Sequence, residues 1–344
     1  MRGNKTVAVA LLGLLAAIVF PFVNPDPFST FVFFLVFTNA VVALYLNLLV
    51  GYGGIFFVSP MIFVGIGGYT AAWLSSTGGF EPWVSLGVGA LAAVISSFIF
   101  SLLSGRLRGL YMVLYSVVFT LLLGALVIQS DPRIFYWTGG PIGLSDLRDL
   151  SLAGINFGSF EYRGVQSGIP YYYFALGVLI ASVLILWKLL RTRFGLAFRS
   201  LRDAEVYSST LGVDSYRLKI GAFLIASFFM GLMGGLQAHF FSNINPTTYS
   251  VDWILHYLTI LVYGGIGTFA GPIVGSAILV TLSQNLSIYG AWRFVVIGIT
   301  VILTLLLIPG GIVGKIEEFR AKRSGGSLMP VPKILLRRLA ESKR

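Results

Sequence analysis

The sequence predicts an all-α polytopic membrane protein with about ten membrane-spanning helices, some of them broken by glycine and proline. Of its 344 residues, 56% are hydrophobic and only 11% are charged, whereas soluble domains carry about 25% charged residues. Its 41 glycines suit the close helix packing found in membranes. We therefore expect one transmembrane domain, residues 1–309, followed by a basic cytoplasmic tail, residues 310–344.

Apolar runs separated by polar segments set the expected spans, since one crossing needs about 20 apolar residues. The first run resembles a signal peptide but lacks a small-residue cleavage site, so we expect a retained helix. The third is interrupted at Ser59 and Pro60 and again at its later glycines. The runs cover residues 6–23, 28–50, 53–74, 83–103, 110–129, 171–190, 220–241, 253–262, 272–287 and 292–308.

The positions of Lys and Arg predict the topology, because basic loops stay on the cytoplasmic side. The basic segments are the N-terminus, Arg106 with Arg108, residues 191–219 and the tail. Placing them all inside makes both termini cytoplasmic and residues 131–170 an external loop. Ten spans satisfy this pattern. Eight also do, if the segments flanking 264–272 only enter the membrane and return, and the sequence leaves both open.

Several function classes are disfavoured by the composition. The net charge of +11 lies in loops beside apolar spans, which argues against nucleic-acid binding. No cysteine is present, so disulfide and thiol chemistry are excluded. The two histidines, His239 and His256, belong to no H-E-x-x-H or Cys/His motif, so we expect neither a metal site nor a catalytic residue.

The energy source is expected to lie in another protein. The nearest candidate for a phosphate-binding loop, residues 310–315, lacks the required spacing, and Ile316 stands where a Ser or Thr is needed. The spans hold almost no ionisable residues, and Lys188 and Arg293 lie near span ends. This disfavours an ion-coupled secondary transporter. Sodium sites made of backbone carbonyls keep that alternative open.

Two clusters of glycine and proline interrupt spans in separate halves of the chain, a pattern that points to a translocation site near the middle of the membrane. Proline removes a helix hydrogen bond and glycine permits close backbone approach. Ordinary glycine packing remains the alternative. The candidate pathway residues are Asn47, Gly51, Gly54, Ser59, Pro60, Gly65 and Gly67 in the first half, and Gly264, Gly265, Gly267, Gly271 and Pro272 in the second.

Six motifs in order resemble those of the permease subunits of ABC importers for branched-chain amino acids, particularly the longer of the paired permeases. Urea-type permeases are related. The resemblance covers about residues 35–315. Its motifs are GYGG at 51–54, GIGGYT at 65–70, RLRGLY at 106–111, TGGPIGL at 138–144, RFG at 193–195 with Arg199, and GGIGTFAGPIVGSAIL at 264–279.

The resemblance implies that a cytoplasmic coupling helix within residues 191–219 contacts an ATPase subunit. Two positions depart from the family pattern, since Tyr207 and Ser208 stand where alanines are usual, and residues 55–60 are more apolar than usual. The residues expected to couple to the ATPase are Arg199, Arg202, Asp203, Glu205, Leu211 and Gly212.

The resemblance also implies the partners: a second homologous permease, two ABC ATPases that hold ATP and Mg²⁺, and an external binding protein that docks on residues 131–170. The chain itself would hold no cofactor and would lie among the lipids of the plasma (inner) membrane. We expect it to form half of a pathway for branched-chain, hydrophobic amino acids. Urea or short amides, sugars or nucleosides, ion-coupled transport and a non-transporting scaffold remain alternatives.

Overall fold

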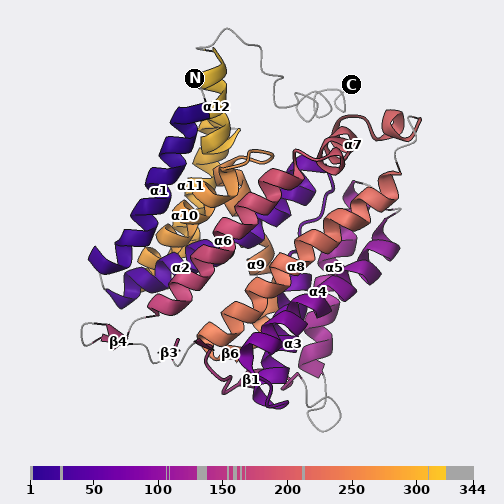
Figure 1. The fold of residues 1–344 in the computed structure, drawn as a ribbon. Coiled ribbons are helices and arrows are strands. Elements are labelled where there is room, and N and C mark those ends of the chain that lie inside the picture. The colour runs from indigo at the N-terminus through magenta and orange to yellow at the C-terminus, as the bar shows by residue number, and fades with distance from the viewer. Residues whose placement is uncertain are drawn as a thin grey trace.

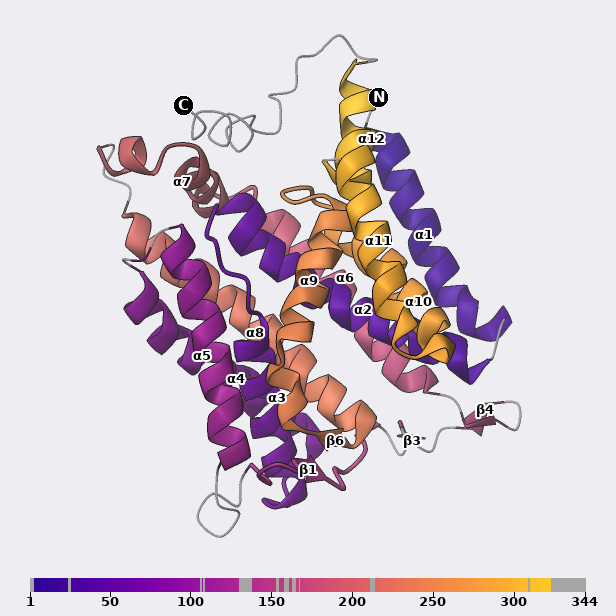
Figure 2. The same ribbon diagram turned by 180° about the vertical axis from the view of Figure 1, so that it is seen from behind.

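The protein is a bundle of helices in a computed structural model that describes residues 3–23, 26–105, 107, 109–129, 138–152, 155–157, 161–162, 165–166, 168–210, 214–308 and 310–322. Figures 1 and 2 show the helices α7 and α12 at one end of the bundle and the short β-strands at the other. We call these the α7 end and the strand end.

The helices are α1 (Gly3–Val23), α2 (Pro27–Asn47), α3 (Met61–Ser76), α4 (Pro82–Ser104), α5 (Leu110–Gln129), α6 (Ile169–Leu189), α7 (Arg193–Thr210), α8 (Ser215–Phe241), α9 (Val251–Gly264), α10 (Gly271–Asn285), α11 (Trp292–Leu307) and α12 (Gly311–Lys322). A π-helical turn, η1 (Leu48–Tyr52), continues α2, and 3₁₀ turns are η2 (Pro246–Tyr249) and η3 (Leu286–Tyr289). The strands are β1 (Leu144–Ser145), β2 (Ser151–Leu152), β3 (Ile155–Asn156), β4 (Glu161–Tyr162), β5 (Val165–Gln166) and β6 (Asn243–Ile244).

Helix starts follow local capping rules. The Asp26 carboxylate accepts a 3.1 Å hydrogen bond from the Ser29 N–H at the start of α2, and Asp214 accepts from the N–H groups of Tyr216 and Arg217 at the start of α8. Side chains of this type satisfy the first N–H groups of a helix, which have no partner within it. The polar connections between apolar runs therefore fix where these two long helices begin.

The chain contains an inverted structural repeat. In the first copy a long helix, α2 with η1, leads into the non-helical residues 53–60 and then into α3, α4 and α5. In the second copy α8 leads into residues 242–250, which lack α-helix, and then into α9, α10 and α11. Because α2 ends at the α7 end and α8 begins there, the copies run in opposite directions (Figure 1). The copies interlock, since α2 packs on α10 and α8 packs on α4.

Ten apolar segments of the described chain run between the two ends of the bundle. Seven helices are long enough to span a membrane, and α3, α9 and the described apolar part of α1, Gly13–Val23, are shorter. The chain reaches α3 and α9 through the non-helical parts of the two repeats, so each of those crossings is part extended and part helical. Residues 265–270 form a turn at the α7 end (Figure 2). This arrangement fits ten crossings rather than eight.

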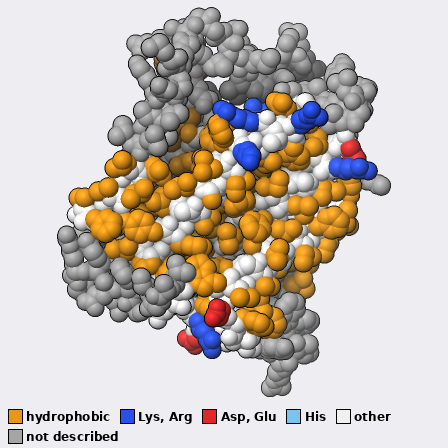
Figure 3. Space-filling model, in the orientation of Figure 1, with side chains coloured by type: hydrophobic (Ala, Val, Ile, Leu, Met, Phe, Trp, Pro, Cys, Tyr) orange, Lys and Arg blue, Asp and Glu red, His pale blue; other side chains and the backbone are white. Residues whose placement is uncertain are grey.

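Charge and apolar surface are distributed as a membrane protein requires. Figure 3 shows a wide band of hydrophobic side chains, with Lys and Arg side chains gathered along its edge at the α7 end. The core lies around α2 and η1, and 94% of the most apolar stretch of this segment is buried. The exposed surfaces of α5 and α11 are rich in Leu, Val and Ile, as expected for helices that face lipid or another membrane subunit.

One expectation about the third span is wrong. Gly65, Gly67 and Gly68 do not interrupt it, because all three lie inside the continuous helix α3. They serve packing instead. A Cβ at Gly67 would overlap the Gly231 backbone of α8, and one at Gly65 would overlap the Tyr249 ring. The interruption is confined to residues 53–60, before the helix starts.

The described part of residues 131–170, the predicted external loop, is anchored to the strand end. Strand β1 pairs with β6 in antiparallel register, with Leu144 opposite Ile244. The Trp83 indole donates a 2.6 Å hydrogen bond to the Ser151 carbonyl. His239 is buried and lies 2.9 Å from the Arg148 carbonyl oxygen and 3.1 Å from the Ser85 hydroxyl. These contacts give His239 a structural role, as the sequence suggested.

Candidate functional site

Helix α7 lies across its end of the bundle with one apolar face buried. Phe198 and Leu201 are almost fully buried, and the rings of Phe194 and Phe198 stack with centroids 5.8 Å apart. These residues are three or four positions apart, the spacing that places side chains on one helix face. The basic stretch is thus an amphipathic helix held by its aromatic side.

Both apolar and basic side chains of α7 contact the end of α2. The Phe198 ring lies against Gly53, where a Cβ would overlap it. The Arg199 guanidinium lies over the Tyr52 ring at 5.1 Å from its centroid, within the range of a cation–π interaction. Arg202 Nη1 donates a 2.7 Å hydrogen bond to the Gly51 carbonyl. Three successive residues of the α2 end therefore contact α7.

The Gly51 carbonyl can accept this bond because α2 loses its helical form just beyond it. The Gly53 and Ile55 N–H groups donate to the carbonyls of Leu48 and Leu49, and the chain then becomes extended. Carbonyls at the end of a helix have no partner within it, so the Arg202 guanidinium provides the hydrogen bond that the Gly51 carbonyl lacks. Gly54 has a φ of +63°, a conformation that glycine adopts without strain.

Asn47 joins the end of α2 to the turn between α9 and α10. Its amide nitrogen donates a 2.8 Å hydrogen bond to the Thr268 carbonyl, and its amide oxygen accepts one of 2.8 Å from the Gly267 N–H. The side chain is fully buried. Gly267 has a φ of +81°, and a Cβ at Gly51 would overlap its backbone. Small residues are therefore required where residues 51–60 meet residues 264–272, which we call the first and second broken segments.

We call the residues at this meeting point the coupling junction: Asn47, Gly51, Gly54, Arg202 and Gly267. All five were predicted as site residues, from two separate groups. The structure brings these groups together, because α7 and both interrupted segments reach the same point. Arg202 contacts both broken segments, because its Nη1 also lies beside Gly267, 3.0 Å from where a Cβ on that residue would be.

The other glycines of the second cluster shape the turn itself. Gly265 has a φ of +106° and packs against Gly311 of α12, while a Cβ at Gly264 or Gly271 would overlap nearby backbone. The Thr268 hydroxyl donates a 2.7 Å hydrogen bond to the Gly265 carbonyl. Pro272 lies in the first turn of α10, where the missing N–H costs nothing. These residues build the turn that Asn47 holds.

Ser59 and Pro60 lie outside the junction. The Ser59 hydroxyl is buried and hydrogen-bonds to the Thr120 hydroxyl of α5, and Pro60 occupies the N-cap of α3. The hydrogen bond between Ser59 and Thr120 links the first broken segment to α5. The predicted place of Ser59 and Pro60 in a translocation pathway remains a prediction.

Some predicted coupling residues cannot be placed. Leu211 and Gly212 lie outside the described residues, and for Asp203 and Glu205 the structure describes only the backbone, within α7. Sequence reasoning also missed Phe198 and Thr268. The three-residue spacing of Phe198 from Leu201 was a usable signal of a buried helix face. Thr268 takes part through its carbonyl, which no side-chain pattern reveals.

Comparison with known proteins identifies the family. Residues 28–305 match the family model described as "Branched-chain amino acid transport system / permease component". The chain belongs to this permease family. The match includes every residue of the coupling junction and both copies of the inverted repeat, except Pro27 at the start of α2 and the last two residues of α11.

Two individual relatives carry the same description as the family, and a third is a ribose permease. The chain is 27% identical over 289 residues to the high-affinity branched-chain amino acid transport system permease protein LivM of Escherichia coli. This match covers 80% of the chain and 65% of the length of that protein. It is 26% identical over 303 residues to a probable LivM of Methanocaldococcus jannaschii, covering 78% and 83%. The ribose import permease protein RbsC of Bacillus subtilis is 28% identical over 196 residues, covering 54% and 57%. No solved structure matched the chain.

Proposed function

We propose that the chain forms half of the translocation pathway of an ATP-binding-cassette importer for branched-chain amino acids. The family assignment and the names of the relatives support transport of this substrate class. The exposed apolar ring of Phe56 in the first broken segment suits a substrate with an aliphatic side chain.

The observation that carries the proposal is the coupling junction. A helix outside the membrane drives transport only if its displacement reaches the segments that open and close the pathway. Arg202 bonds the end of α2, and Asn47 bonds the same end to the α9–α10 turn. A shift of α7 would therefore act on both broken segments at once.

The partners follow from this mechanism. A second homologous permease completes the pathway, and two ATPases bind ATP and Mg²⁺ and move α7, so this chain holds no cofactor of its own. An external binding protein delivers substrate to the strand end, where residues 131–170 are the candidate surface. The complex lies in the plasma (inner) membrane with α7 on the cytoplasmic side.

Reconstitution tests the proposal. The chain would be purified with candidate partners, namely a second permease of this family, ABC ATPases and a binding protein, and placed in proteoliposomes that contain ATP and Mg²⁺. We expect uptake of radiolabelled leucine that requires all subunits. Uptake of ribose or urea without leucine would overturn the substrate assignment. Uptake by this chain alone under a proton or sodium gradient would overturn the mechanism and favour a secondary transporter.

A further inference from the structure

Residues 242–250, which join α8 to α9, are the counterpart of residues 53–60 in the inverted repeat. We call them the outer segment, because they begin at the strand end, opposite to the coupling junction (Figure 1). Two family motifs, GIGGYT at 65–70 and TGGPIGL at 138–144, contact this segment. Neither motif takes part in the coupling junction, so their meeting at the outer segment indicates a separate role.

The side chain of Tyr249 fills a socket between α3 and α5 and is only 4% exposed. A Cβ at Gly65 would overlap the Tyr249 ring, and one at Gly124 would lie 3.1 Å from the Tyr249 Cβ. Glycine at both positions therefore makes room for this side chain. The Tyr69 ring of α3 stacks on it, with centroids 6.0 Å apart. One aromatic side chain thus holds the outer segment between the two helices.

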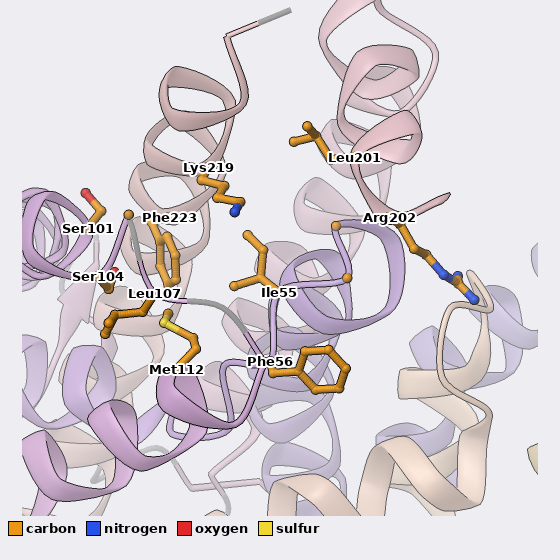
Figure 4. A pocket seen from close by; sticks show the side chains of 14 residues that line it. Ile55, Phe56, Ser101, Ser104, Leu107, Met112, Leu201, Arg202, Lys219 and Phe223 are labelled. Atoms are coloured by element: carbon orange, nitrogen blue, oxygen red, sulfur yellow. The ribbon is translucent and has the colours of Figure 1, made fainter. Parts of the chain in front are cut away.

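The socket lies on the strand-end side of the first broken segment. Ser59 of that segment bonds to Thr120, and Gly124 is one turn further along α5 toward the strand end. Phe56 lies on the other side, where it lines a pocket of about 370 Å³ at the α7 end (Figure 4). Along α5, the Tyr249 ring therefore lies between the strand end and Phe56, the side chain that we propose to meet the substrate.

The external surface is joined directly to the outer segment. β1 pairs with β6, which places Leu144 opposite Ile244, five residues before Tyr249. Gly143 has a φ of +80°, and a Cβ there would overlap the Ile244 carbonyl. Leu144 and Ile244 also pack in one apolar cluster with Tyr249. A displacement of residues 138–145 would therefore move the outer segment and the Tyr249 ring.

The packed arrangement leaves a polar group without a partner. The Tyr69 hydroxyl is buried and forms no hydrogen bond with a described residue. A buried hydroxyl in this state is unfavourable, and buried polar groups normally have a partner. Withdrawal of Tyr249 would let water or substrate reach this hydroxyl, which offsets part of the apolar contact that is lost.

We propose that Tyr249 is an outer gate: its ring closes the translocation pathway toward the strand end, and residues 138–145 withdraw it when an external binding protein docks on them. The partner and the substrate rest on the proposed function. Docking opens the gate to the extent that the binding protein contacts the displaced loop more favourably than the resting one. The two ends are then built alike, since α7 bonds the end of α2 and β1 bonds the chain that follows α8.

A disulfide tests whether the outer segment has to move. The chain has no cysteine, and a Cβ at Gly124 lies 3.1 Å from that of Tyr249, close to the separation of about 3.5–4.5 Å in disulfides. The double variant Gly124→Cys with Tyr249→Cys would be reconstituted with cysteine-free partner subunits. We expect oxidation to lower leucine uptake at least tenfold and reduction to restore it. The two single variants are the controls, and oxidation should not change their uptake.

Removing the ring tests closure. In right-side-out membrane vesicles that hold the full complex without binding protein or ATP, Phe56→Cys would be labelled by a membrane-impermeant thiol reagent added outside. Labelling should be at least fivefold faster when Tyr249→Ala is added. Tyr249→Phe keeps the ring and should not accelerate labelling. Tyr172→Ala is the matched control, because Tyr172 is a buried tyrosine that packs on Phe37 of α2 instead.

The outcomes separate this proposal from the proposed function. Normal leucine uptake by the native complex, together with unchanged uptake by the oxidised and verified cross-link, would refute the gate and leave the transport function standing. Faster labelling with Tyr249→Ala alone, without leucine uptake by the native complex, would support the gate and refute the substrate assignment. Equal labelling with Tyr249→Ala and Tyr172→Ala would overturn the gate, since Tyr249 would then be an ordinary packed side chain.

Discussion

Arg202 of α7 donates a 2.7 Å hydrogen bond to the Gly51 carbonyl at the end of α2. The two residues are 151 positions apart in the chain; Gly51 belongs to the GYGG motif, and Arg202 is one of the residues expected to couple to the ATPase. The bond joins the helix that we propose to contact the ATPase to the helix at the centre of the bundle.

Removing the Arg202 guanidinium should uncouple transport. A hydrogen bond from a charged donor contributes about 1.5–3 kcal/mol, so Arg202→Met should lower leucine uptake about tenfold or more while the ATPases still bind and hydrolyse ATP. The measurement is the ratio of leucine imported to ATP hydrolysed. Arg191→Met is the control, because Arg191 lies over the Trp187 ring instead. An unchanged ratio for Arg202→Met would contradict the assignment.

Loss of the Asn47 amide should destabilise the junction. Asn47→Leu leaves the Gly267 N–H and the Thr268 carbonyl without partners, at about 1–3 kcal/mol for each buried group. We expect a lower melting temperature of the purified complex and reduced uptake. Asn39→Leu in the same helix is the control, because the Asn39 amide donates only to the Leu35 carbonyl one turn away. Equal effects of the two changes would argue against a special role for Asn47.

The packing role of Gly67 makes a stability prediction. Gly67→Ala would drive its Cβ into the Gly231 backbone, and overpacking of this kind costs about 1–3 kcal/mol. Gly87→Ala in α4 meets open space and should be neutral or slightly stabilising, since alanine favours helix over glycine by about 1 kcal/mol. Thermal unfolding in detergent would compare them. A Gly67 variant as stable as the Gly87 variant would refute the close contact.

The hydroxyl pair between Ser59 and Thr120 should couple the first broken segment to α5. We expect a double-mutant cycle of Ser59→Ala and Thr120→Val to give an interaction free energy of about 0.5–1.5 kcal/mol, the range of a neutral hydrogen bond. Strictly additive effects on unfolding would show that the pair does not act as a unit. Leucine uptake by the same variants would test whether the contact matters for transport.

The predicted contact between α7 and the ATPase has its own test. Glu205→Lys and Gly212→Trp should each reduce leucine uptake by an order of magnitude without unfolding the protein, because one reverses a charge and the other adds bulk at a surface expected to fit a groove. Uptake and co-purification of the ATPases would be measured together. Native values of both in each variant would rule out this part of the interface.

Local sequence properties determined much of the fold. Span positions follow from apolar length, which each segment carries by itself, and the helix starts follow from capping residues such as Asp26 and Asp214. The family motifs are also local and were sufficient to predict the permease. A helix within residues 191–219 was expected from the family resemblance, but its amphipathic character and its aromatic anchor Phe198 were not predicted.

What only the tertiary structure decided is which glycines break a helix and which pack against one. Gly67 and Gly267 look alike in sequence, but Gly67 meets the backbone of α8 inside a continuous helix, whereas Gly267 turns at φ +81° against Asn47. Their partners lie far away in the chain: Asn47 and Gly267 are 220 positions apart. A contact over that distance depends on how helices pack, and no local pattern encodes it. For the same reason, the coupling junction is recognised only once the helices are packed together.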